Sequence, residues 1–377
     1  MCKKTARLSL IALMFVVVGI LVLPKPMVCD AKSKMKFTRT KGKNKSDVKT
    51  LKKIIRKNLR KDCDSVNLYT NFNSSKYQWN AKGRLVRFEA DGVLKGNVSF
   101  SKMKKLKYLS VGRGQDRGKG RIKSLNIKGC TSLEYLDCYS NKLTKLDLSH
   151  NKALRTLNCS DNQIQKLDLS KNKSLESLSC WGNGLSRLNV SGCRYLKEIW
   201  CLSNHLSGLY LSSNVALVTL DCSDNKLSSL DVSFNTALTY LKCYDNKLGS
   251  LDVSSNTALA YLECYDNKLS NLDVSSNTAL VDLYCSDNKL YKIDISACKL
   301  LEVLGCGGND LENIDLTGNT VLKKLCCEDN KLKDLDVSVC TELENLRCYN
   351  NQIISLNLTN NKKLQDIKCD DIVTIVR

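Results

Sequence analysis

The chain has 377 residues, of which 59 are lysine or arginine, 38 are aspartate or glutamate, and only 6% are aromatic. The low aromatic content and the two prolines exclude a large aromatic core and a proline-rich linker. The net charge of +21 is uneven, because residues 31–130 carry 29 basic and 6 acidic side chains, whereas residues 131–377 carry 26 and 31. The N-terminal third is therefore strongly basic, and the remainder is mildly acidic.

The N-terminus has the pattern of an export signal. Basic residues Lys3, Lys4 and Arg7 precede an apolar run from Leu8 to Leu23, and a small-residue cleavage position follows near Ala31. This order of charge, apolar run and small residue is typical of a secretory signal peptide. We expect residues 1–31 to be a signal peptide, with an uncleaved anchor as the alternative, and a protein that is secreted or held at the cell surface.

Residues 32–78 are expected to form a basic arm and an N-terminal cap helix. Asp47 suits a helix start, and Leu51, Ile54, Ile55 and Leu59 fall on one face at helical spacing. Since an open stack of repeats needs a covered end, a cap is the first interpretation. The alternative is a basic helix that binds an anionic polymer or a membrane surface.

A repeat of 21 residues dominates the rest of the chain. Its template is L-x-x-L-x-C-x-x-N-x-L-x-x-L-D-V-S-x-N-x-x. Repeats of 20 to 50 residues indicate a stacked solenoid. The cysteine of the template recurs at intervals of 21 residues, at Cys138, Cys159, Cys180, Cys201, Cys222, Cys243, Cys264, Cys285, Cys306, Cys327, Cys348 and Cys369.

Two divergent repeats precede the cysteine column. Leu85 precedes Leu106 by 21 residues, whereas Leu106 precedes Leu133 by 27. The extra six residues lie in a basic, glycine-rich loop at 112–120. We therefore divide the chain at 79–132 for the divergent first repeats and 133–377 for the cysteine repeats, which end in a terminal apolar edge strand. About 14 rungs are expected.

The alternation of side chains along a strand predicts which residues face the core. Leu241 and Cys243 should point inward, whereas Tyr240, Lys242 and Tyr244 should point outward. The second half of each repeat has the same spacing of apolar residues as the first. We therefore expect a curved, right-handed stack with short parallel strands on both long faces.

The repeat resembles a known family. The leucine-rich repeat signature L-x-x-L-x-L-x-x-N/C-x-L is matched in every unit from Leu133 to Asn351, with cysteine in the central apolar place. The nested 21-residue form is similar to that of cysteine-ladder internalins and related secreted bacterial repeat proteins, over roughly residues 106–370. The resemblance implies a curved leucine-rich repeat β-solenoid, a non-catalytic binding role and a cell-surface or extracellular setting.

The cysteine column is interpreted as structural. Buried free cysteine behaves as a small hydrophobic residue with a weak donor, so a ladder of reduced thiols is the leading interpretation. Disulfides between rungs and a metal site are the alternatives, although a straight column does not converge on a metal ion. Four further cysteines share the second asparagine column of the repeat: Cys130, Cys193, Cys298 and Cys340.

Two polar columns accompany the cysteines. The asparagine columns from Asn141 to Asn351 and from Asn151 to Asn361 are expected to satisfy backbone groups at the turns. An outward aspartate column is the weaker candidate for a calcium site, since carboxylates from one row alone make a thin site. Its members are Asp147, Asp168, Asp231, Asp252, Asp273, Asp294, Asp315 and Asp336.

The predicted ligand surface is the outward side of the first strand of each repeat. Exposed tyrosine and tryptophan are enriched at binding interfaces, although aromatic residues also simply suit strand surfaces. The candidate residues are Tyr135, Tyr139, Trp181, Trp200, Tyr240, Lys242, Tyr244, Tyr261, Glu263, Tyr265, Tyr284 and Tyr349. We expect recognition of a protein ligand or adhesion through this face, with Tyr240 to Tyr284 as its centre.

The alternative function is binding of a cell-wall anionic polymer or carbohydrate, through the basic N-terminal region or through Trp181 and Trp200. Catalysis has little support, because the two histidines, His150 and His205, are far apart and no catalytic motif is present. The sequence therefore predicts a monomeric, non-enzymatic protein without a cofactor, metal or nucleic-acid partner.

Overall fold

The structure is a computed structural model that describes residues 35–60, 66–112 and 121–377. The predicted signal peptide at 1–31 and most of the predicted basic loop at 112–120 lie outside the described residues.

The chain forms two described helices followed by a long series of short strands. The helices are α2 (Lys45–Asn58) and α3 (Val66–Thr70). The strands are β1 (Tyr77–Trp79), β2 (Leu85–Glu89), β3 (Lys95–Ser99), β4 (Tyr108–Ser110), β5 (Arg121–Asn126), β6 (Tyr135–Asp137), β7 (Thr156–Asn158), β8 (Ser177–Ser179), β9 (Glu198–Trp200), β10 (Thr219–Asp221), β11 (Tyr240–Lys242), β12 (Tyr261–Glu263), β13 (Asp282–Tyr284), β14 (Val303–Gly305), β15 (Lys324–Cys326), β16 (Asn345–Arg347), β17 (Ser355–Asn357), β18 (Asp366–Lys368) and β19 (Thr374–Val376).

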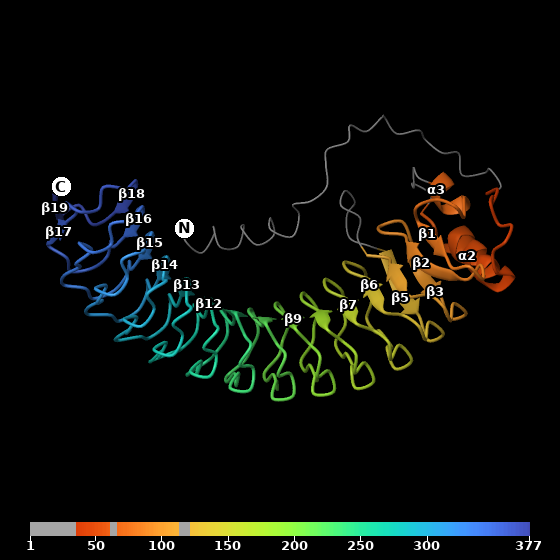
Figure 1. Cartoon of the computed structure of the whole chain (residues 1–377), viewed down its shortest axis with the longest axis horizontal. Coiled ribbons are helices and arrows are strands. Elements are labelled where there is room, and N and C mark those ends of the chain that lie inside the picture. Colours follow the sequence, from red (N-terminus) through yellow and green to blue (C-terminus); the bar gives the residue numbers. More distant parts are fainter. Residues whose placement is uncertain (1–34, 61–65, 113–120) are drawn as a thin grey trace.

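One long sheet lines the concave side of a curved solenoid (Figure 1). In the described residues it has 15 strands, in the order β1-β2-β4, then β6 to β16, then β18. Only β1 is antiparallel to its neighbour. The other fourteen strands are parallel, one for each expected rung, which confirms the predicted solenoid.

The register of this sheet confirms the repeat spacing. Leu241 pairs with Leu262, so one rung equals 21 residues. Leu109 pairs with Phe88 on one side and with Leu136 on the other, so the first divergent rung is also 21 residues long and the second 27. The six extra residues therefore extend one rung without disturbing the ladder.

The core consists of inward leucine and cysteine side chains stacked from rung to rung. Leu241, Cys243 and Leu248 are fully buried, as the alternation predicts. All described cysteines are free, and those from Cys130 to Cys348 are buried. Burial raises the pKa of the thiols, to about 12 for Cys159 and Cys285, because a thiolate in an apolar core loses its hydration. The cysteines therefore act as core residues.

The first asparagine column satisfies the backbone where the chain leaves each strand. The Asn246 amide donates to the carbonyl oxygens of Cys222, Cys243 and Tyr244 at 3.1, 3.1 and 3.2 Å. Its Oδ1 accepts from the backbone N–H of Leu227 at 2.9 Å. This side chain therefore uses both its donor and its acceptor to join successive rungs.

The second asparagine column uses only its donor. The Asn256 amide donates to the carbonyl oxygens of Val232 and Asn235 at 3.0 and 2.8 Å, but its Oδ1 is buried without a hydrogen-bond partner. Cys298 occupies the same column, and its Sγ lies 3.7 and 3.8 Å from the two corresponding carbonyl oxygens. Cysteine is tolerated there because that position needs a donor and no acceptor.

The second long face carries the predicted short parallel strands in part of its length. Among the described residues, parallel pairs occur there only near the two ends, between β3 and β5 and between β17 and β19, with two isolated bridges between them. The aspartate column explains the interruption. Asp252 Oδ1 accepts from the backbone N–H of Ser254 at 2.9 Å and from its hydroxyl at 2.7 Å. Such local bonds turn the backbone away from a ladder.

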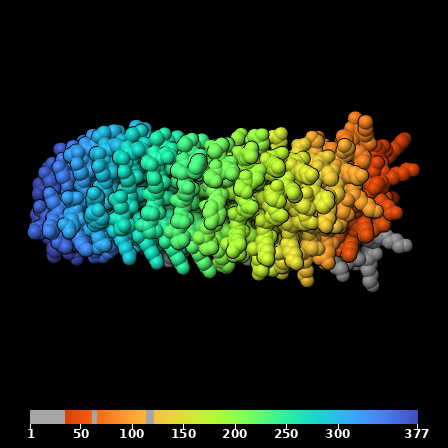
Figure 2. Space-filling view, turned by 90° about the horizontal axis from the view of Figure 1, so that it is seen from below, coloured from red at the N-terminus to blue at the C-terminus, as the bar shows by residue number. Residues whose placement is uncertain are grey.

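The curvature of the solenoid also disfavours strand pairing on the second face. The rungs lie close together on the concave side and fan apart on the convex side (Figure 1), where they form separate ridges in the space-filling view (Figure 2). Hydrogen bonds between strands need a strand spacing near 4.8 Å, so they persist on the concave side and are interrupted where the rungs fan apart. The aspartate column, for its part, forms the local turns described above.

The N-terminal end is covered by α2, as the helical pattern predicts. Asn44 begins the helix, and its side chain accepts from the backbone N–H groups of Ser46 and Asp47 at 3.1 and 3.2 Å. Leu51, Ile54 and Ile55 are buried against the first rungs. Asp47 is buried as well, where Arg84 pairs with it at 2.8 Å.

The two asparagine columns should respond differently to cysteine. We expect Asn246→Cys to lower the free energy of unfolding by about 3 kcal/mol, because it removes the acceptor of a buried N–H. Asn256→Cys should cost about 1 kcal/mol or less, since only donor bonds weaken. Chemical denaturation of both variants measures the difference, and equal losses would contradict the assignment.

Candidate functional site

Five consecutive strands, β9 to β13, bring the central candidate residues together on the concave sheet. Each strand offers two outward positions, at its first and last residue, and a third outward position lies just after the repeat cysteine. These positions form three columns across the parallel register. We call the six aromatic residues in these columns the concave patch: Trp200, Tyr240, Tyr244, Tyr261, Tyr265 and Tyr284.

The rings of the concave patch stack between rungs. The ring centroids of Tyr240 and Tyr261 are 4.6 Å apart, and those of Tyr244 and Tyr265 are 4.4 Å apart, both nearly coplanar. Trp200 lies 6.1 Å from Tyr240 at one end, and Tyr284 lies 6.0 Å from Tyr261 at the other. The stacks hold the side chains in place, so little conformational entropy is lost when a ligand binds.

Three charged residues form the middle of the central column, between the two tyrosine stacks. We call Asp221, Lys242 and Glu263 the charged triad, and they pair in sequence across β10, β11 and β12. Lys242 Nζ lies 3.0 Å from Glu263 Oε1 and 5.1 Å from the centroid of the Tyr261 ring. The Tyr261 hydroxyl also donates to Glu263. The lysine is thus held by a carboxylate and by aromatic faces.

Asp221 is the third member of the triad and is 1% exposed. Its carboxylate accepts from the backbone N–H of Ser223 at 3.1 Å and from the Ser223 hydroxyl. Burial raises the pKa of Asp221 to about 6, although the Ser223 bonds and the Lys242 charge act in the opposite direction.

The expectation that Lys242 and Glu263 offer exposed contacts is corrected by their burial. The two residues point outward from the sheet, as predicted, but are only 3% and 2% exposed. Neighbouring tyrosines and the salt bridge cover them. Tyr265 is also buried, at 9%, whereas Tyr240, Tyr244, Tyr261 and Tyr284 are half-buried.

Tyr135, Tyr139 and Trp181 form a separate group nearer the N-terminus, whereas Tyr349 lies apart from both groups, just after β16. Tyr135 stacks on Tyr108 at 4.2 Å, and the Arg87 guanidinium lies 3.4 Å from the centroid of the Tyr108 ring. Tyr139 and Trp181 lie 5.6 Å apart. Strands β7 and β8 place small polar side chains between Tyr135 and Trp200, while Trp181, just after β8, lies one rung from Trp200.

Three residues that contact the predicted ones were not themselves predicted from the sequence: Asp221, Arg87 and Tyr108. Asp221 has the same place beside a repeat cysteine as Lys242 and Glu263, so reading the columns across rungs would have found it. Arg87 and Tyr108 lie in the divergent rungs, which lack the cysteine that marks the columns.

Other kinds of site find no support in the described part of the chain. No group of three or more histidine, cysteine or acidic residues is placed to hold a metal ion in residues 35–60, 66–112 and 121–377. Within these same ranges, no helix has the length and apolar character needed to cross a membrane.

No family model and no curated protein matches the sequence. Solved structures do match. The functional domain of InlJ from Listeria monocytogenes, which includes a cysteine ladder, is 35% identical with a TM-score of 0.72, over 77% of this chain and 64% of that one. The chain thus spans less than two thirds of that InlJ domain.

Two further structures share the fold at lower identity. The internalin inlF from Listeria monocytogenes is 20% identical over 76% of this chain and 87% of its own, with a TM-score of 0.66. The leucine-rich repeat protein LIC12759 from Leptospira interrogans is 20% identical over 81% and 89%, with a TM-score of 0.59.

The topology and these similarities show that the chain has the leucine-rich repeat fold. More particularly, its repeats are similar to those of the internalins, and its column of buried cysteines corresponds to the cysteine ladder that InlJ includes. The resemblance expected from the repeat template is therefore confirmed.

The burial of Lys242 makes a testable contribution to stability. We expect Lys242→Met to lower the free energy of unfolding by about 3 kcal/mol, because it leaves two buried carboxylates without their cation. Lys247→Met, at an exposed position, should change it by less than about 0.5 kcal/mol. Adding Glu263→Gln to Lys242→Met should recover part of the loss. Urea denaturation tests all three, and a neutral Lys242→Met would contradict the buried pair.

Asp221 should make stability depend on pH. Its folded pKa of about 6 lies above the ordinary value of 3.8, so the folded state binds its proton more tightly than the unfolded state. The stability that this group contributes is fully present below about pH 4 and is lost as the pH rises through about 6. As the pH rises from 4 to 7, the free energy of unfolding of Asp221→Asn should therefore increase relative to that of wild type by up to about 3 kcal/mol. Chemical denaturation of both proteins across this pH range measures the effect, and a stability difference that does not change with pH would contradict the raised pKa of Asp221.

Proposed function

We propose that the chain is a secreted, non-catalytic recognition protein that binds a protein ligand through its concave patch. The observation that carries this proposal is the set of six aromatic rings on the rungs of β9, β11, β12 and β13 of the concave sheet, four of which form two stacked pairs. Tyrosine and tryptophan supply large contact areas with a polar group at the edge, and they are enriched where proteins bind proteins.

Rigidity supports the same function. The rings stack on neighbouring rungs, and the strands that bear them are short segments of a continuous parallel ladder. A preformed surface of this kind loses little freedom on binding, so its contact area is converted into affinity more fully than that of a mobile loop.

The charge of the patch favours a ligand that presents a basic side chain. The charged triad has two carboxylates for one lysine, and the half-buried Asp282 carboxylate lies in the next rung. Burial raises the pKa of Asp282, and Glu302 and Glu263 add to the effect. A cation placed among the tyrosine rings is attracted by the carboxylates and by the aromatic faces.

Secretion is part of the proposal and rests on the pattern of residues 1–31. The similarity to InlJ over the repeats supports an extracellular recognition role. Adhesion to a host or neighbouring cell is the form of protein recognition that this setting favours.

The concave patch is tested by a binding screen against cell-surface proteins and glycans. The triple variant Tyr240→Ala, Tyr244→Ala and Tyr261→Ala should weaken binding of the captured protein by at least about 30-fold, because central aromatic residues dominate interface energies. The matched control is Tyr195→Ala, Tyr210→Ala and Tyr291→Ala, which removes three tyrosines that are 65%, 83% and 58% exposed elsewhere. A protein ligand indifferent to the first variant, or equally sensitive to the control, refutes the assignment.

A further inference from the structure

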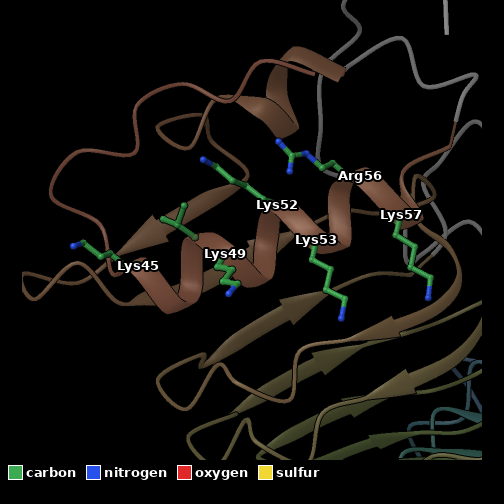
Figure 3. Close-up of a pocket in the computed structure, with 7 residues that line it drawn as sticks. Lys45, Lys49, Lys52, Lys53, Arg56 and Lys57 are labelled. Atoms are coloured by element: carbon green, nitrogen blue, oxygen red, sulfur yellow. The ribbon is translucent and has the colours of Figure 1, made fainter. Parts of the chain in front are cut away.

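The cap helix α2 carries a dense cationic surface. With about 100° of rotation per residue, its Lys45, Lys49, Lys52, Lys53, Arg56 and Lys57 fall within an arc of about 140°. Figure 3 shows these side chains along the helix, with Lys49, Lys53 and Lys57 extending toward the neighbouring strands. The opposite side of the helix is buried in the core.

The edge of the first rungs continues this charge. The Asn58 amide ties α2 to β3 by donating to the carbonyl oxygens of Lys95 and Asn97 at 2.7 and 2.9 Å. This contact places Lys57 at one hollow with basic residues of the rungs, namely Lys95, Arg121, Lys123 and Lys142. A second hollow, between α2 and the β3–β5 pair, is lined by Lys49, Lys53, Lys57 and Lys102.

Segments far apart in the sequence thus form one basic surface. We define this basic surface as Lys45, Lys49, Lys53, Lys57, Lys95, Lys102, Arg121, Lys123 and Lys142. It lies at the N-terminal end of the solenoid, apart from the concave patch on β9 to β13 (Figure 1).

Counter-charges for this surface are lacking among the described residues. In residues 35–60 and 66–112, the carboxylates of Asp47, Glu89 and Asp91 are bonded to Arg84, Arg87 and Ser110, respectively. The ion pairs between described residues include no member of the basic surface. Like charges at this density repel one another, so an anionic ligand would relieve an unfavourable field.

The chemistry of the surface favours a polymer over a membrane or a single strand of nucleic acid. Its apolar lining residues, Val48, Ile54 and Val98, are 9% exposed or less, so nothing is placed to insert into a lipid layer. Among the residues that the structure describes, no aromatic ring lines the hollows for a base to stack on. Lysine predominates, and its ammonium group binds as a point charge without the planar geometry of arginine.

We propose that the basic surface binds an extended polyanion with closely repeated phosphate or carboxylate groups. Several weak lysine contacts along one chain add up, whereas a single anion gains only one or two of them. This site is additional to the concave patch, so a chain could be held on an anionic polymer while the concave face remains free for its protein ligand.

The test uses the full chain and two matched variants. The first replaces Lys49, Lys53, Lys57, Arg121 and Lys123 by Gln, which keeps the helix propensity and exposed positions. The control replaces Lys166, Lys226, Lys247, Lys268 and Lys289 by Gln, which removes the same number of exposed charges from the repeats. Circular dichroism and thermal unfolding verify that both variants fold. If the first variant does not, Lys95, Lys102 and Lys142→Gln takes its place, since these residues lie off the helix.

Binding of long-chain polyphosphate, polygalacturonate, orthophosphate and anionic lipid vesicles is measured at about 50 and 200 mM salt. We expect wild type to bind one of the polymers. The first variant should bind it at least about tenfold more weakly and with a smaller salt dependence, whereas the control variant should bind it as tightly as wild type. Preference for polyphosphate identifies a phosphate polymer, and preference for polygalacturonate identifies a carboxylate polymer. No polymer binding at low salt, equal loss in the control, or binding of orthophosphate or vesicles as tightly as the polymer overturns the proposal.

Discussion

The hydrogen bonds of the first asparagine column are the constraint on which the rest of the molecule depends. At the end of each strand the chain turns across the core, and its backbone groups would be buried without partners. Asn246 and its equivalents accept from one rung and donate to carbonyl oxygens of two rungs. An insertion inside a rung must therefore leave these positions in register. The six extra residues of the second divergent rung do so, because Leu109 and Leu136 still pair.

This constraint separates structure from recognition. Inward leucine, cysteine and asparagine side chains specify the stack, so the outward positions on the concave sheet are free to vary. The concave patch uses that freedom for stacked rings and even for a buried charged triad. Burying three charges is unfavourable by itself. The regular core beneath provides the stability that tolerates it, and the result is a surface with a defined shape and charge.

The parts of the fold that follow from periodicity could be predicted from the sequence, and the parts that depend on neighbouring rungs could not. The spacing of Leu241 and Cys243 is enough to place them inside. The periodicity does not tell where the short strands of the second face are interrupted, because Asp252 makes a local turn and because curvature separates the rungs there. The burial of Lys242 was missed because it depends on Tyr240, Tyr261 and Glu263 from its own and the next rung. The aromatic candidates were found, but their division into two groups needed the register.

Side-chain footprinting by hydroxyl radicals, with and without a bound protein ligand, tests whether the concave sheet is the recognition surface. We expect Tyr240, Tyr244, Tyr261 and Tyr284 to become protected in the complex. Tyr195, Tyr210 and Tyr291, which lie outside the concave patch, should keep their labelling rates. Protection of the second set with unchanged labelling of the first would contradict the claim that the concave sheet is the recognition surface.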